Sequence, residues 1–323
     1  MKIMILDILK KTGDWVSGET LCREMGVSRT AVWKHIRTLR EEGYHIEARS
    51  NLGYRLLQAP DIPLPGEITA GLLTAVMGRR IEYLPELPST NDIAEKLARG
   101  GCPEGTVVVT ELQTGGKGRM GRPWFSPPGK GLWFTVVLRP PVNPAETPQM
   151  TMVAAVAVAE AIREHTGVEA DIKWPNDILV HEKKLCGILV ELNAEMDRVN
   201  FMVAGMGLNV NVPRSEFPPE IRDTATSLQA ESGRYIPRVP LLRALLKSIE
   251  DWYSLWLDHG FAPVLSRWRE LCVTLDCPVT VHTIRESYTG HAIDVDETGA
   301  LLVKTEDGSI ERLLAGEVTL HKR

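Results

Sequence analysis

A glycine-rich loop followed by prolines limits which fold this chain can adopt. Residues 115–124 read GGKGRMGRPW, in which Gly116, Gly118 and Gly121 form a G-x-G-x-x-G pattern. Such a pattern binds dinucleotides when it follows a strand and opens a helix, and the β-branched residues 106–112 do predict a preceding strand. Three prolines follow within seven residues, however, and proline inside a helix removes a donor and clashes with the preceding turn. No acidic residue lies about twenty residues further on to bind a ribose. A doubly wound dinucleotide-binding fold is therefore not expected.

The composition is that of a soluble protein from a reducing compartment. Five scattered cysteines form no C-x-x-C motif and lie beside no histidine cluster, so neither a disulfide framework nor a zinc site is predicted. The longest apolar stretch, residues 150–162, is too short and too rich in alanine to span a bilayer, and no signal peptide is recognisable. We expect a cytoplasmic protein of two or three domains with no membrane partner.

The first sixty residues differ in charge from the rest. They carry ten Lys and Arg against seven Asp and Glu, whereas the remaining 263 residues carry 27 against 35. A basic end on an acidic chain indicates a polyanionic partner for that end only.

This basic end has the pattern of a winged helix-turn-helix domain. Helices are predicted over 4–11, 17–26 and 27–43, and residues 44–57 add two strands around an Asn-Leu-Gly turn, the wing. The third helix would bury Val32, Ile36 and Leu39. Its outer face carries the predicted DNA-binding residues, which are Ser28, Arg29, Thr30, Trp33, Lys34 and Arg37. The alternative is an interaction module with a solvated basic face, but the order of the elements and the placement of charge favour DNA binding.

The rest of the chain predicts an α+β fold. A proline-rich linker at 59–67 separates a first domain of residues 1–58 from a second of 68–271. Helices are predicted over 92–99, 147–167, 239–258 and 261–271, and strands over 105–112, 132–138, 170–174, 177–181, 186–192 and 201–205. Hairpin spacings among these strands predict a mixed or antiparallel sheet. Residues 272–323 alternate with period two around two glycine turns, which predicts a small β-barrel.

Four further segments carry polar residues at the ends of these elements. They are PSTND (88–92), KWPND (173–177), KKLCGILVEL (183–192) and GMGLNVN (205–211). Each has an ordinary structural explanation as a helix cap, a Pro-Asn turn, solvated edge charges or a bulge. Those explanations do not predict that all four occur around a basic glycine loop, so a shared functional site is the better interpretation.

Together these motifs resemble the biotin–protein ligases, in the long form whose N-terminal winged helix represses the biotin operon. The resemblance covers essentially the whole chain, and the glycine loop, KWPND and K-L-x-G-I-L-V-E are its most specific parts. It implies a mixed-sheet ligase domain like that of class II synthetases and an SH3-like C-terminal barrel. It also implies a two-step reaction. Biotin and ATP, with Mg²⁺, give biotinyl-5′-AMP and pyrophosphate, and a lysine of a carrier protein then takes the biotin.

The resemblance also implies partners. The acceptor would be the biotin carboxyl carrier protein of acetyl-CoA carboxylase or of another biotin-dependent carboxylase. The remaining partners would be operator DNA and, when the adenylate is bound as corepressor, a second subunit in a homodimer.

Site residues follow from the motifs and from this resemblance. The expected biotin-binding residues are Ser89, Thr90, Asn91, Gln113, Lys117, Gly118, Arg119 and Lys184. The expected nucleotide-binding residues are Lys117, Arg119, Arg122, Trp124, Lys173, Asp177 and Asn209. Lys184, Lys173 and Arg119 are the expected catalytic residues, and no protein side chain is expected as a metal ligand.

These residue types suit the chemistry. Hydroxyls and amides match the ureido group of biotin, and cations neutralise the two anions that must react. Glycine amides can approach a phosphate closely without a helix behind them. We therefore expect the glycine loop, residues 115–124, to be a lid over the acyl-adenylate.

Two residues of the loop depart from the family pattern, which is commonly G-R-G-R-R-G-R. Lys117 keeps the positive charge but lacks the bidentate fork of arginine, and Met120 removes a charge. Activity should survive, whereas retention of the adenylate is the property placed in doubt.

Two other functions remain open. A lipoate ligase or octanoyl transferase could use the same scaffold, although the winged helix and the C-terminal barrel argue against it. A non-enzymatic biotin sensor that binds DNA would lack Lys173 or Lys184, and both are present.

Overall fold

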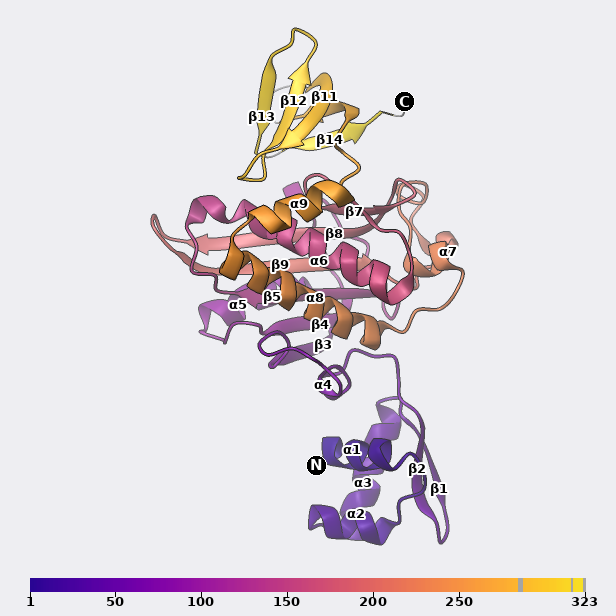
Figure 1. Ribbon diagram of the computed structural model, residues 1–323. Coiled ribbons are helices and arrows are strands. Elements are labelled where there is room, and N and C mark those ends of the chain that lie inside the picture. Colours follow the sequence, from indigo (N-terminus) through magenta and orange to yellow (C-terminus); the bar gives the residue numbers. More distant parts are fainter. Residues whose placement is uncertain (284–286, 315, 322–323) are drawn as a thin grey trace. The chain divides into compact units, whose positions relative to one another are not determined.

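The computed structural model describes residues 1–283, 287–314 and 316–321 of the chain. They form two compact units, Met1–Ile62 and Pro63–Arg323 (Figure 1). The end of the predicted linker 59–67 is not extended, because the short helix α4 (Pro65–Thr69) begins there. The separate domain proposed for residues 272–323 remains a prediction.

The first unit has the helices and wing that the sequence predicts. Its elements are α1 (Lys2–Thr12), α2 (Gly18–Met25), α3 (Arg29–Glu41), β1 (His45–Arg49) and β2 (Gly53–Gln58). The Ser17 and Ser28 hydroxyls cap α2 and α3 by accepting hydrogen bonds from backbone N–H groups. Val32, Ile36 and Leu39 are each about 1% exposed, so the apolar stripe of α3 is buried as its periodicity predicts.

A mixed seven-stranded sheet forms the middle of the second unit. Its strands are β3 (Ile81–Leu87), β4 (Val107–Gln113), β5 (Gly131–Leu138), β6 (Asp171–Lys173), β7 (Asp177–Val180), β8 (Lys183–Ala194) and β9 (Val199–Asn209). The spatial order is β3-β4-β5-β9-β8-β7-β6, in which only β3 and β4 pair in parallel. Strand β3 was not predicted. It contains Pro85, and an edge strand tolerates proline because it has one unpaired side.

Helices cover both faces of this sheet. Figure 1 shows α6 (Pro148–Thr166) and α8 (Arg238–His259) lying across one face, and α9 (Ala262–Leu271) packs against α6. Helix α5 (Thr90–Arg99) packs against the other face. The sheet therefore has a hydrophobic core on each face. Val107 and Val109 of β4 belong to the larger core with α6 and α8, whereas Val108 belongs to the smaller core with α5.

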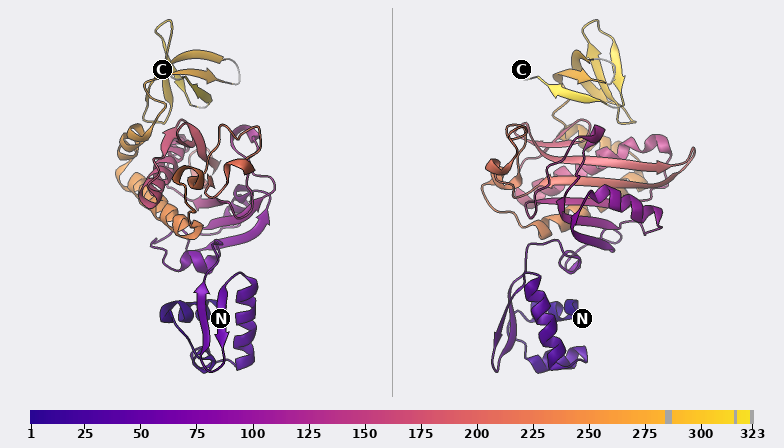
Figure 2. Two further views of the ribbon diagram at one scale, coloured as in Figure 1. Left: turned by 90° about the vertical axis from the view of Figure 1, so that its right-hand side faces the viewer. Right: turned by 180° about the vertical axis from the view of Figure 1, so that it is seen from behind.

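The C-terminal strands form a second sheet. These are β10 (Cys277–His282), β11 (Ser287–Val295), β12 (Leu301–Thr305), β13 (Ile310–Leu313) and β14 (Glu317–Leu320), in the antiparallel order β13-β12-β11-β10-β14. This small β domain is fixed beside the KWPND turn because Trp174 Nε1 donates to Gly299 O at 3.1 Å. Both turn glycines, Gly299 and Gly308, have φ near +86° and +87°, which explains the breaks in the alternating pattern. Figure 2 shows this sheet from two further sides. In the described part of the chain, no helix is both long and apolar enough to cross a membrane.

Candidate functional site

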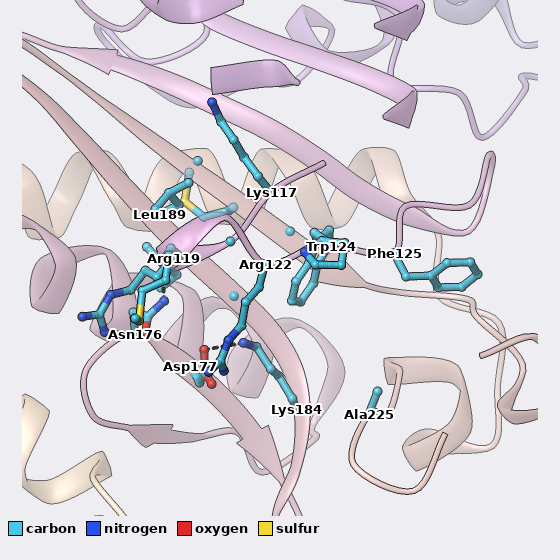
Figure 3. A pocket seen from close by; sticks show the side chains of 18 of the residues that line it. Lys117, Arg119, Arg122, Trp124, Phe125, Asn176, Asp177, Lys184, Leu189 and Ala225 are labelled. Carbon is cyan, nitrogen blue, oxygen red and sulfur yellow. Dashed lines mark hydrogen bonds and ion pairs between the residues drawn. The ribbon is translucent and has the colours of Figure 1, made fainter. Parts of the chain in front are cut away.

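A cavity of about 420 Å³ gathers residues from distant parts of the second unit (Figure 3). Its walls come from the glycine loop, the KWPND turn, strands β8 and β9, the segment 217–225 and strand β14. All thirteen residues predicted to bind biotin or the nucleotide line it: Ser89, Thr90, Asn91, Gln113, Lys117, Gly118, Arg119, Arg122, Trp124, Lys173, Asp177, Lys184 and Asn209. The structure therefore brings the predicted residues together, and their individual roles remain proposals.

Hydroxyl and amide groups line the part of the cavity beside α5. Gln113 Oε1 accepts hydrogen bonds from the backbone N–H of Thr90 at 2.9 Å and from its hydroxyl at 3.2 Å. Ser89 occupies the N-cap position of α5 without a capping hydrogen bond, and its side chain is buried at 3% exposure. The helix-cap explanation thus does not hold for Ser89, whose hydroxyl can serve a ligand instead.

Asn91 is held by the sheet beneath it. Its amide nitrogen donates to Leu189 O at 3.2 Å and to Glu191 Oε2 at 2.7 Å, and the Thr135 hydroxyl lies 2.7 Å from its carbonyl oxygen. A Cβ atom at Gly205 would lie only 2.0 Å from that oxygen. The first glycine of GMG therefore makes room for Asn91, whose donors are both used inside the protein.

Trp124 lies flat on a second pair of glycines. Gly187 and Gly207 face one another across β8 and β9. A Cβ atom on Gly187 would lie 2.9 Å from the indole, and one on Gly207 would lie 2.4 Å from it. The Lys184 ammonium lies 5.3 Å from the centroid of the ring, a cation–π distance. The glycines in β8 and β9 thus form a floor that lets the end of the glycine loop approach Lys184.

Cations gather at the other part of the cavity. The Lys184 ammonium lies 2.7 Å from Asp177 Oδ1, and Arg119 Nη1 donates to Asn176 Oδ1 at 3.3 Å. Burial lowers the pKa of the Arg119 guanidinium, although nearby Asp177 and Glu317 oppose this shift. Such a desolvated cation interacts strongly with an incoming phosphate. Among the described residues nothing pairs with the Lys173 ammonium, which leaves it for an anionic ligand.

Asn209 adds an unsatisfied acceptor to the same wall. Its amide nitrogen donates to Thr226 O at 3.0 Å. Its oxygen is buried and, within the described ranges, has no hydrogen-bond partner. A buried acceptor without a hydrogen bond costs stability, so a donor group on a ligand would supply the hydrogen bond that the Asn209 oxygen lacks.

The glycine loop is folded back on itself and held on two sides. The backbone N–H of Trp124 donates to Gly116 O at 2.8 Å, and the side chain of Arg122 pairs with Glu317 of β14. The Lys117 ammonium lies 2.6 Å from Asp92 Oδ1, and this hydrogen bond raises the pKa of Lys117. Figure 3 shows Lys117 pointing away from Lys184 and Asp177. In this conformation Lys117 therefore anchors the loop to α5.

Met120 stands at the tip of the loop. It has a positive φ of 57° and is 70% exposed. Met120 also borders the cavity, so the charge that this departure removes is missing from an exposed position at the cavity.

Some cavity residues were not predicted from the sequence. Asn176 lies within KWPND, so the motif could have identified it. Glu317 and Thr319 of β14, and the segment 217–225, carry no motif that would associate them with the loop. They reach the cavity only through the packing of the C-terminal sheet and the irregular chain after β9.

The predicted DNA-binding face is exposed on α3. All six residues, Ser28, Arg29, Thr30, Trp33, Lys34 and Arg37, are exposed. Trp33 retains 51% of its surface, which is unusual for so large an apolar side chain, and the Arg37 guanidinium lies 5.9 Å from its ring. Arg37 Nε also donates to Glu41 at 2.9 Å. The outer face of α3 thus presents cations and an aromatic ring, as a recognition helix does.

Comparisons with known proteins agree with both surfaces. Residues 2–55 match the helix-turn-helix domain family, 83–209 the biotin/lipoate A/B protein ligase family, and 274–320 the biotin protein ligase C-terminal domain. The bifunctional ligase/repressor BirA of Bacillus subtilis is 40% identical over 98% of this chain and 97% of its own length.

Two further relatives match only part of this chain. The biotin–[acetyl-CoA-carboxylase] ligase of Paracoccus denitrificans is 31% identical, and the match covers 70% of this chain and 94% of that protein. The biotin protein ligase of Aquifex aeolicus, solved in complex with biotin and ATP, superposes with a TM-score of 0.65 at 32% identity, covering 76% of this chain and all of that one. The chain therefore belongs to the biotin protein ligase family, in the group of bifunctional ligase/repressors that carry an N-terminal helix-turn-helix domain.

Proposed function

We propose that the protein is an ATP-dependent biotin–protein ligase that also represses transcription. In the first step a carboxylate oxygen of biotin attacks the α-phosphorus of ATP. The bond to the β-phosphate oxygen breaks, and biotinyl-5′-AMP and pyrophosphate form. In the second step the neutral amine of a carrier lysine attacks the acyl carbonyl, AMP leaves, and the amine gives up a proton as the amide forms.

The cavity residues divide this work according to their chemistry. Ser89, Thr90 and Gln113 supply hydrogen-bonding groups for the ureido ring of biotin. Lys184 binds the reacting carboxylate, with Asp177 holding its ammonium in place. Arg119 and Lys173 neutralise charge that builds up on the phosphates, which is the main task in phosphoryl transfer.

Mg²⁺ is expected to accompany the ATP phosphates and to neutralise part of their charge. The described residues hold no group of three or more His, Cys, Asp or Glu side chains suited to a metal. Mg²⁺ is usually held by one or two carboxylates together with phosphates and water. Asp177 and Glu317 are the carboxylates that line the cavity, and Asp177 is the one nearer the catalytic lysine.

The observation that best supports the ligase function is that one cavity contains both a neutral hydrogen-bonding region and a cationic region. A neutral hydrogen-bonding part beside α5 lies next to a cationic part at Lys173 and Lys184. Pyrophosphate release from ATP should require biotin and should not occur with lipoate. Release with lipoate instead would favour the lipoate ligase, and no release with either would favour the non-enzymatic sensor.

The carrier and the DNA are the proposed macromolecular partners. We take the biotin carboxyl carrier protein of acetyl-CoA carboxylase as the acceptor, and operator DNA as the ligand of α3. Every residue that lines the cavity lies in the second unit, which supports a ligase that does not need the first unit for catalysis.

Repression is proposed to depend on a homodimer. One recognition helix on a modestly basic domain gives weak site-specific binding, and helix-turn-helix proteins commonly bind two half-sites as dimers. Biotinyl-5′-AMP held under the glycine loop would stabilise a nearby dimer surface, and a carrier protein would compete for that surface. Since coupling of this kind is typically worth about 1–3 kcal/mol, the adenylate should tighten dimerisation by about tenfold or more. Sedimentation with and without biotinyl-5′-AMP measures this, and an unchanged monomer–dimer balance would contradict the regulatory proposal.

A further inference from the structure

The main chain of Lys184 is held by a segment outside its own hairpin. Lys184 N–H donates to Thr224 O at 2.7 Å, and Lys184 O accepts from Thr226 N–H at 2.9 Å. These two bonds form a short parallel bridge next to Ala225. They occur where the register between β7 and β8 shifts. The hydrogen-bond ladder between two strands is locally disrupted at such an irregularity. The position of the Lys184 main chain therefore depends more on this bridge than on the β7–β8 ladder.

The bridging segment is in turn fixed by Glu231 of α7 (Leu228–Ser232). The buried Thr226 hydroxyl donates to Glu231 Oε1. The carbonyl of the same Thr226 accepts from Asn209 Nδ2. This one hydrogen bond, accepted by Glu231, therefore fixes Thr226, whose main chain bonds both Lys184 and Asn209 of the cavity.

The other oxygen of Glu231 contacts the turn that leads into β8. His181 Nδ1 lies 2.9 Å from Glu231 Oε2. His181 and Glu182 form this turn in the left-handed region, with φ of 46° and 67°. The Glu231 side chain is only 16% exposed, whereas that of His181 is 82% exposed. We expect the contact to Thr226 to dominate, because a contact with so exposed a side chain contributes little.

We propose that Glu231 is a positioning residue for the adenylation centre, acting through Thr226 on Lys184 and Asn209. It does not line the cavity, so it cannot bind the substrates itself. Its importance rests on the proposed function, because a lysine that must meet both a carboxylate and a phosphate tolerates little displacement. A shift of about 1 Å in such a group can cost about a hundredfold in rate.

The test uses Glu231→Ala and Glu231→Gln in the full-length chain. Pyrophosphate release with biotin and ATP reports the first step. Transfer from synthetic biotinyl-5′-AMP, at saturation, to a purified biotin carboxyl carrier domain reports the second. Glu231→Ala should lower kcat for the first step at least about tenfold while the second step changes much less, since the carboxylate and phosphate are already joined. Glu231→Gln should retain most activity because its amide oxygen still accepts from Thr226.

Two controls separate positioning from general destabilisation. His181→Ala should have a small effect, and Glu195→Ala should have none. Glu195 likewise pairs with a basic residue and a polar neighbour, Arg198 and Asn200, but belongs to the β8–β9 turn. Equal loss of both steps in Glu231→Ala, or activity within twofold of the unmodified protein, would overturn the inference. If the unmodified protein itself released no pyrophosphate with biotin, the proposed function would fail instead.

Discussion

The recognition helix and the ligase cavity place their functional residues in opposite ways. The six exposed residues at α3 lie within ten consecutive positions, 28–37, where Ser28 caps the helix and the other five lie in it. The cavity residues extend from Ser89 to Thr319 and come from loops, two turns, a helix start and the ends of several strands. A helical period is enough to arrange the first set. The second set depends on strand order, on register and on the docking of the C-terminal sheet.

This contrast also concerns what each surface does with its charge. On α3 the cations face solvent, where salt screens them and where a polyanion can approach from outside. In the cavity Arg119 is desolvated and Lys184 is paired with Asp177. Cations of the second kind are suited to a small enclosed anion. If the two surfaces are built independently, a change in one should leave the intrinsic activity of the other unaltered.

The largest expected effect comes from removing one surface altogether. A fragment beginning at Leu64 should biotinylate a carrier domain at close to the full-length rate, because every cavity residue lies beyond that point. Specific DNA binding should be lost completely. Ligase assays and DNA mobility shifts on the same preparation measure both, and a well-folded but inactive fragment would mean that the first unit takes part in catalysis.

The next effect separates the cavity lysine from its neighbour. Lys184→Ala should lose about 2–5 kcal/mol of transition-state stabilisation in adenylate formation, because an anion would be left without its charged partner. Arg122→Ala should lose far less, since the charge of Arg122 is already paired with Glu317.

Lys183→Ala is the matched control. Lys183 is adjacent in β8 but does not line the cavity, so its loss should leave adenylation nearly unchanged. Single-turnover formation of biotinyl-5′-AMP compares the three variants. Near-normal adenylation by Lys184→Ala would refute the role assigned to it.

A smaller effect is expected at the glycine floor. Gly207→Ala would place a Cβ atom 2.4 Å from the Trp124 indole, and overpacking of this kind typically costs about 1–3 kcal/mol. The lifted loop end should raise KM for biotin and ATP. Gly187→Ala should be milder, since its nearest contact would be 2.9 Å. Equal and unchanged KM values in both variants would show that Trp124 need not lie on the sheet.

The smallest effect concerns one phosphate contact. Lys34→Ala should weaken binding to all DNA sequences about equally and reduce the slope of log K against log salt by about one. Lys11→Ala, which removes an exposed lysine from α1 instead, should leave the slope unchanged. A salt slope that is the same in both variants would remove Lys34 from the DNA-binding face.

Much of this molecule could be predicted from the order of its residues. The caps at Ser17 and Ser28, the apolar stripe of α3 and most strands of the second unit follow from local patterns. The residues of the cavity were identified because short motifs and the resemblance to a ligase family marked them, and all thirteen line the cavity. Strand β3 could not be predicted because Pro85 and the acidic residues around it break the alternation of polar and apolar residues that is typical of a strand.

Other features were decided by the tertiary structure alone. No local pattern pairs Arg122 with Glu317, which is 195 residues away, or fixes Lys184 through Thr226 and Glu231. The same holds for Gly187 and Gly207, which become a floor only because the β8–β9 register places them opposite one another beneath Trp124. The sequence by itself determines periodicity, caps and turns, since these depend on neighbours within a few residues. Contacts between distant segments depend on which faces can be buried together, and that is settled only when the whole sheet and its helices pack.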